Sequence, residues 1–159
     1  MYKVSFKDDF KKVERFNNKV TKVTLKGSIN DHYTPNGLDV PRPIIDWMID
    51  SWGDTDTIKV IEVSGIAIRS NKDKDDPVLG ERLAEARAKH KIYKFMRTFC
   101  HKMLKYYALK LYGINTNNTI TVRAIDQESY VDSLQKAYKK YSRLVDVENT
   151  HIKQLLYDY

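Results

Sequence analysis

The 159-residue chain has one cysteine and no apolar run that approaches the ~20 residues needed to cross a bilayer. A single cysteine excludes an internal disulfide, and the N-terminal segment MYKVSFKDDFKK lacks the apolar stretch of a secretory signal. We therefore expect a protein that acts in a reducing cytoplasm and does not bind membranes.

The sequence also lacks the residue patterns that carry catalysis or hold a cofactor. Its four histidines are scattered, none is spaced from another or from Cys100 like a zinc ligand, and there is no glycine-rich phosphate loop. Cys100 falls among apolar helical positions, which is typical of a small buried residue. The acids Asp73, Asp75 and Asp76 lack the continuation of a calcium loop and suit a helix N-terminus instead. We predict no catalytic residue, no metal and no cofactor.

One set of carboxylates leaves a catalytic alternative open. A restriction-type nuclease needs an Asp followed by Glu-x-Lys on a strand, and here Glu62 is not followed by a lysine two residues later. Asp54, Asp56 and Glu62 could still gather around a metal ion, so a metal-dependent nuclease remains an alternative.

The order of predicted elements indicates an α+β fold. A small antiparallel sheet packs against two main helices, one of them long and basic, in a single domain over residues 1–159. Residues 1–18 could form a strand and a short helix, 28–40 and 70–77 read as loops, and residues 147–159 could add a further turn or two. Strands are expected at 19–26, 58–69 and 119–125, and helices at 41–52, 78–112 and from Asp126 onward.

Several residues mark the boundaries and irregularities of these elements. The prolines of PRPIIDWMIDSW stand in a first helical turn, where a missing N–H costs nothing. Gly113 is expected to end the long helix, and Asp126 to cap the last one. Gly65, inside the strongest strand pattern, indicates a bulge or a close approach of another backbone.

Charge is distributed very unevenly along the chain. Residues 86–125 carry nine Lys and Arg and no Asp or Glu, hence +9, which leaves −2 for the remainder of a chain whose net charge is +7. Such a basic segment on a nearly neutral body attracts polyanions or acidic protein surfaces.

The long basic helix separates two kinds of side chain. At 100° per residue, most of its aromatic and methionine residues share one arc, while a row of cations and histidines shares the opposite one. Like charges stand four residues apart in this row with no acid between them, which mildly destabilises a helix. Either the row is the solvated side of a core helix, or its charge is kept for a partner. The candidate binding residues are Arg87, His90, Lys91, Lys94, Arg97, His101 and Lys105.

Two tryptophans stand on the short predicted helix. Trp47 and Trp52 lie among Asp46, Asp50 and Asp54, and one of the two is expected in the core. Because tryptophan dominates many interface hot spots, the two are candidate interface anchors.

One segment carries a resemblance. The span from Gly65-Ile66-Ala67 through Asp73-Lys74-Asp75-Asp76 to the helix start GERLAEARA (80–88) resembles a strand–acidic-loop–helix segment of small uncharacterised bacteriophage and prophage proteins. Size and the lack of an enzymatic motif are also similar to anti-CRISPR proteins that block Cas9. The resemblance implies a non-enzymatic phage or mobile-element interaction protein in the host cytoplasm.

The resemblance also implies a class of partner. The partner would be a host nuclease such as Cas9 or its guide-RNA complex. A net charge of +7 does not suit a mimic of DNA, so an inhibitor of this kind would bind a protein surface or the guide RNA. The alternative is a DNA- or RNA-binding accessory protein that uses Arg87, Lys91, Lys94, Arg97 and Lys105 on phosphates.

Overall fold

The computed structural model of the chain describes residues 4–31, 41–52, 60–69, 76–115 and 122–158. In this part of the chain the elements follow the order β1 (Val4–Phe16), β2 (Val20–Asp31), α1 (Arg42–Trp52), β3 (Val60–Ile68), α2 (Pro77–Asn115) and α3 (Val122–Asp158). The strands form one antiparallel sheet in the order β1-β2-β3. Among the described residues, no helix combines the length and the apolarity that crossing a bilayer requires.

The first two strands form a long hairpin closed by a tight turn over residues 17–19. Asn17 and Asn18 have positive φ angles of 53° and 56°, and Lys19 N donates to Phe16 O at 3.1 Å. These are the features of the tight turns that match strand twist, and asparagine tolerates the left-handed region better than most residues. The expected short helix within residues 1–18 is therefore wrong.

A helical spacing of apolar residues explains this error. Phe10, Val13 and Phe16 stand three residues apart, as on a helix face, but pairing with β2 holds them in a strand. The strand itself is irregular, because its register shifts between Asp8 and Phe10.

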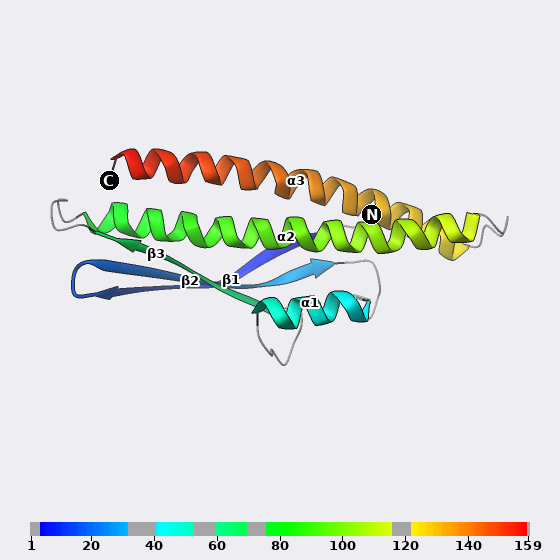
Figure 1. Cartoon of the computed structure of the whole chain (residues 1–159), viewed down its shortest axis with the longest axis horizontal. Coiled ribbons are helices and arrows are strands. Elements are labelled where there is room, and N and C mark those ends of the chain that lie inside the picture. The colour runs from blue at the N-terminus through cyan, green and yellow to red at the C-terminus, as the bar shows by residue number, and fades with distance from the viewer. Residues whose placement is uncertain (1–3, 32–40, 53–59, 70–75, 116–121, 159) are drawn as a thin grey trace.

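The molecule is built in layers, with α2 between the sheet and α3 (Figure 1). Helix α2 lies on β2 and β3, and α3 runs antiparallel along α2. The core between them includes Val23 and Ile61 from the sheet, Phe99 from α2 and Tyr130 from α3. Cys100 is a buried free thiol in this core, as predicted. The elements thus pack as one α+β domain, which confirms the predicted fold class.

Helix α2 begins where the sequence predicts. Pro77 is its first residue, Asp76 accepts a hydrogen bond from Leu79 N at 3.0 Å, and Gly80 N donates to Asp76 O. This is N-capping, and it assigns Asp76 a structural role. Asp73 and Asp75 lie outside the described residues.

Gly65 allows α2 to lie unusually close to β3. A Cβ atom at this position would overlap Ala84 O and would stand 2.6 Å from Ala88 N, both backbone atoms of α2. Pairing with Val23 of β2 is regular here, so of the two expectations the close approach is confirmed and the bulge is not.

The C-terminal half differs from the sequence prediction at its helix boundaries. Helix α2 continues through Gly113 to Asn115, and α3 begins at Val122, four residues before the expected cap Asp126. The predicted strand over 119–125 is therefore wrong for residues 122–125, and residues 119–121 lie outside the described residues. β-branched residues favour a strand, but this preference is weak, and here these residues belong to a helix. The expected turns after residue 147 are a continuation of α3.

Candidate functional site

The seven predicted binding residues lie together on one side of α2, which we call the basic face: Arg87, His90, Lys91, Lys94, Arg97, His101 and Lys105. Contacts fix its two borders. On one border Arg87 and Lys91 reach the backbone of β3, and on the other the His101 ring lies 5.7 Å from that of Tyr138 in α3. The basic face is therefore the strip of α2 between the edge of β3 and α3.

Two cations of the basic face are bound to the free edge of β3. Arg69 N donates to Lys19 O at 2.7 Å, so the odd-numbered residues of β3 turn their backbone groups to β2 and the even-numbered ones turn theirs outward. At that outer edge Arg87 Nη1 donates to Ile66 O and Lys91 Nζ donates to Ser64 O, each at 2.6 Å. Charged side chains on an exposed edge oppose pairing with another strand. These two cations thus have an internal role that the sequence did not reveal.

The other cations of the face have no such contact. Lys94 and Lys105 are exposed and Arg97 is half-buried. Among the described residues, none of the seven members of the face forms an ion pair with a carboxylate. From Arg87 to Lys105 the face is about 27 Å long at about 1.5 Å per residue. The face is a long strip of positive charge that the described residues leave without an ion pair.

His90 does not add to this charge near neutral pH. Partial burial and the positive charges of Lys94 and Arg97 lower the pKa of His90 below its ordinary 6.5, against an opposing effect of Glu148. The lysines and arginines therefore supply the positive potential of the basic face.

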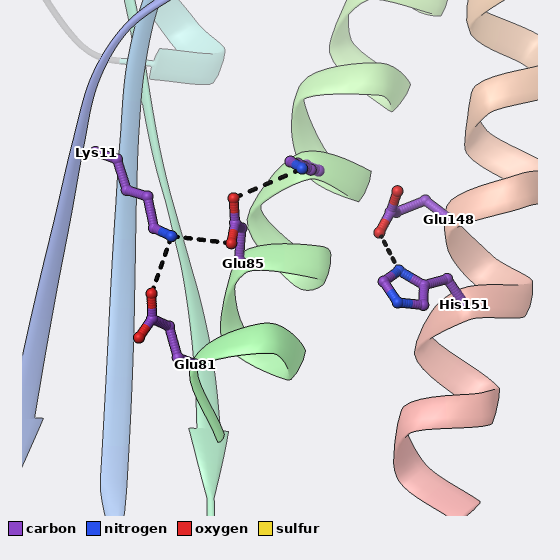
Figure 2. Close-up of polar contacts among 6 residues, drawn as sticks. Lys11, Glu81, Glu85, Glu148 and His151 are labelled. Atoms are coloured by element: carbon purple, nitrogen blue, oxygen red, sulfur yellow. Dashed lines mark hydrogen bonds and ion pairs between the residues drawn. The ribbon is translucent and has the colours of Figure 1, made fainter. Parts of the chain in front are cut away.

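The acids of α2 stand on another side of the helix, next to β1. Figure 2 shows Lys11 of β1 between Glu81 and Glu85, with Nζ 3.0 Å from a carboxylate oxygen of each. Lys89 Nζ stands 3.6 Å from the other oxygen of Glu85. Partial burial acts to raise the pKa of Glu85, but the hydrogen bonds and charges of Lys11 and Lys89 outweigh it and hold that pKa below 4.5. The carboxylates of this cluster are thus neutralised locally.

Helix α3 contains an ion pair between two of its own residues, His151 and Glu148. His151 Nδ1 stands 2.9 Å from Glu148 Oε1, three residues away on the same helix (Figure 2). Glu148 influences His90, as above, but its own hydrogen bond goes to His151.

A cavity of about 270 Å³ opens where β1, α2 and α3 meet. At this junction the Tyr141 hydroxyl accepts a hydrogen bond from Phe6 N at 2.8 Å, and burial raises the pKa of Tyr141 to about 12. The two lysines of the cavity are already engaged, Lys89 with Glu85 and Lys140 over the Tyr141 ring at 5.5 Å. The cavity lining is Phe6, Asp8, Lys89, Ile92, Tyr93, Lys140, Tyr141 and Leu144. These contacts join β1 to both long helices.

The candidate interface anchors differ in what the structure describes. The Trp47 ring stacks on Phe95 of α2 at 5.2 Å and 8°, with Lys102 Nζ 5.2 Å from its centroid. Trp47 thus packs α1 onto α2 while a minor part of the residue stays accessible. Trp52 is the last residue of α1, and its side chain lies outside the described part.

The possible metal carboxylates are not brought together in the described part of the chain. Glu62 is exposed on β3, and Asp54 and Asp56 lie outside the described residues. Within residues 4–31, 41–52, 60–69, 76–115 and 122–158 no three potential metal ligands cluster.

Comparison of the chain with protein-family models, curated proteins and solved structures finds no match. Several residues of the segment that carries the phage resemblance have a structural role. Gly65, Ala84 and Ala88, all within it, form the close contact between β3 and α2, and Asp76 caps the helix. Packing accounts for Gly65, Ala84 and Ala88, and capping accounts for Asp76.

Proposed function

We propose that this protein is a non-enzymatic interaction protein of a phage or other mobile element, and that it binds an anionic partner through the basic face of α2. The observation that carries the proposal is the row of cations along about 27 Å of helix without a carboxylate partner in the described chain. Keeping like charges at helical spacing costs stability, which argues that the row is used.

In its most specific form, the proposal is that the partner is a host Cas9 nuclease or its guide-RNA complex. The net charge of +7 suits an acidic protein surface or RNA and does not suit imitation of DNA. Inhibition then requires only that the protein bind one conformation of a mobile nuclease domain better than the other. A near-complete switch needs a difference of about 5.5 kcal/mol between the binding free energies for the two conformations.

Pull-down and DNA-cleavage assays with Cas9 enzymes of Gram-positive bacteria test this form. We expect wild type to bind and inhibit, and a triple variant with Lys94→Glu, Arg97→Glu and Lys105→Glu to lose both activities. The matched control reverses three exposed α3 cations: Lys139→Glu, Arg143→Glu and Lys153→Glu. If no nuclease is bound, the Cas9 form is rejected. Equal loss in both triple variants would show that total charge, and not the basic face, matters.

The alternative function is DNA or RNA binding through the same face, which is favoured because none of the described carboxylates pairs with a residue of this face. The logarithm of the binding constant should then fall by about 0.7–0.9 for each phosphate contacted and each tenfold rise in salt concentration. Because Arg87 and Lys91 hold the β3 edge, the structure favours phosphate contacts by Lys94, Arg97 and Lys105. Three such contacts predict that the logarithm of the binding constant falls by about 2–3 for each tenfold rise in salt concentration. Titration of labelled single- and double-stranded DNA and RNA at several salt concentrations measures it, and no binding at low salt removes this alternative.

A further inference from the structure

The face of the sheet that points away from α2 exposes large apolar side chains. Figure 1 shows α2 and α3 on the same side of the sheet, and α1 packs on α2 through Trp47. Alternate residues of each strand therefore point to a second face, which we call the open face. Its members include Lys7, Phe10, Lys12, Glu14, Phe16, Val20, Lys22, Thr24, Lys26, Ser28, Glu62, Ser64, Ile66 and Ile68, of which Thr24 is buried.

Four of these side chains are unusually exposed for their size. The exposed fractions are 52% for Phe10, 47% for Phe16, 45% for Ile66 and 68% for Ile68. The strand register places Phe16, Val20 and Ile68 in one row across the three strands, next to Ile66. An antiparallel sheet with one wet face normally places polar residues there, so a continuous apolar row indicates a binding surface.

Charge on the open face is balanced, unlike that on the basic face. Lys26 pairs in register with Glu62, and Lys22 with Glu14. Lys12 Nζ also stands 3.7 Å from Glu14. Lys7 pairs in register with Ser28, whose Oγ stands 3.5 Å from Asp9 Oδ2. Four lysines thus stand near three carboxylates, which gives little attraction for a polyanion and little repulsion toward a surface of the same composition. We propose that the open face binds the open face of a second copy of this chain.

The position of the basic face favours this arrangement over other contacts between copies. Residues 86–125 carry +9, so two copies repel if their α2 helices meet. Sheets that pack face to face stand about 10 Å apart, and here each α2 lies on the far side of its own sheet. The basic faces are then separated by more than the Debye length of about 8 Å at physiological salt.

Pairing of copies through the β3 edge is disfavoured by the structure. Arg87 and Lys91 already occupy the outward carbonyl groups of Ile66 and Ser64. An incoming strand would have to displace both cations before it could hydrogen-bond there. Face-to-face packing leaves these hydrogen bonds in place.

The size of the open face predicts a weak dimer. Nine residues of β3 span about 30 Å and three strands about 14 Å, so each copy contributes about 400 Å² in projection. The two copies together contribute about 800 Å², which is below the ~1,000 Å² that stable interfaces exceed, so we expect a transient dimer that dissociates in the micromolar range or above. Because the contact is apolar, its affinity should not weaken as salt rises.

Sedimentation equilibrium over a range from about 1 µM to several hundred µM tests the proposal. We expect wild type to dimerise as concentration rises, and Ile68→Lys and Phe16→Lys to stay monomeric, because each places a charge in the apolar row. Val147→Lys is the matched control, since Val147 on α3 is 55% exposed and away from the sheet. It should dimerise like wild type, and circular dichroism should show that all variants are folded.

Three outcomes overturn the proposal: a wild type that is monomeric at every concentration, dimers of both open-face variants, or loss of dimer in Val147→Lys. A wild-type dimer that dissociates as salt rises would also contradict an apolar interface. Reversal of Lys94, Arg97 and Lys105 should leave the dimer intact, so the test is independent of the function proposed for the basic face.

Discussion

Replacing Gly65 by alanine puts a methyl group where the backbone of α2 already lies. The added Cβ would overlap Ala84 O and approach Ala88 N to 2.6 Å. Neither atom is the end of a flexible side chain, so no rotamer change relieves the contact. Helix α2 must move away from β3, or β3 must distort its pairing with β2.

The cost is expected to exceed that of ordinary overpacking in a core, which is about 1–3 kcal/mol. Ala84 and Ala88 are both fully buried at the contact, and a shift of α2 would open the packing of Ile92 and Phe95 further along the helix. Alanine gains about 0.5–1 kcal/mol over glycine from backbone entropy, which offsets only part of this. We expect a loss of about 3 kcal/mol or more, a large part of the 5–15 kcal/mol typical of a domain.

Urea unfolding followed by circular dichroism measures this loss, with Ile66→Ala as the control on the exposed side of the same strand. Ile66→Ala should change the free energy of unfolding by less than about 1 kcal/mol. A double variant with Ala84→Gly separates the causes, because removing the Ala84 methyl leaves the obstructing backbone in place. If Gly65→Ala costs less than about 1 kcal/mol, or if Ala84→Gly restores its stability, the close-approach argument is wrong.

The remaining predictions concern the polar contacts of Tyr141, Lys11 and His90. Tyr141→Phe removes the acceptor of Phe6 N and should cost about 1–3 kcal/mol in urea unfolding, whereas Tyr138→Phe should cost less than about 1 kcal/mol; equal effects would contradict the assignment. The pKa of Tyr141 is raised from 10.0 to about 12, so the contribution of Tyr141 to folding stability is complete below pH 10 and is lost between pH 10 and 12. Urea midpoints that stay constant over this range would refute this prediction. Lys11→Met should cost less than about 1 kcal/mol because its ion pairs are largely exposed, and a larger loss would contradict this. The pKa of His90, measured by NMR, should lie below 6.5. The contribution of His90 to folding stability is then present above pH 6.5 and is lost as the pH falls, and a titration midpoint above 6.5 would refute this prediction.

Sequence periodicity was sufficient for the elements that bury one face. The helix at 41–52, the strand at 58–69 and the long helix from 78 onward match α1, β3 and α2 within a few residues. Their buried residues follow one period, and local signals such as Pro77 and Asp76 agree with the predicted start of α2.

Two of the errors concern segments whose local pattern disagrees with the element they form. The spacing of Phe10, Val13 and Phe16 suggests a helix, yet the turn after Phe16 pairs the segment with β2. Residues 122–125 have a strand-like composition, yet they belong to the helix α3. Neither outcome is encoded in the residues of the segment alone.

The same limit applies to the site. Helical geometry was enough to place the seven members of the basic face on one side of α2. The bonds of Arg87 and Lys91 to β3 depend on how the helix crosses the sheet, and the bond from Phe6 N to Tyr141 joins residues 135 positions apart. Contacts of this kind depend on the packing angle and register of whole elements, which one sequence does not specify.

The two bonds to β3 change how the lack of acids in the basic face should be interpreted. A glutamate at position 87 or 91 would place a carboxylate beside the carbonyl oxygens of Ile66 and Ser64, so the fold itself favours cations there. No described contact makes the same demand at Lys94 or Lys105, which are exposed and remain positive. Variants of Arg87 and Lys91 therefore alter the edge of the sheet together with the charge of the face. Variants of Lys94 and Lys105 alter the charge alone, and it is their effect on partner binding that separates a functional surface from a structural one.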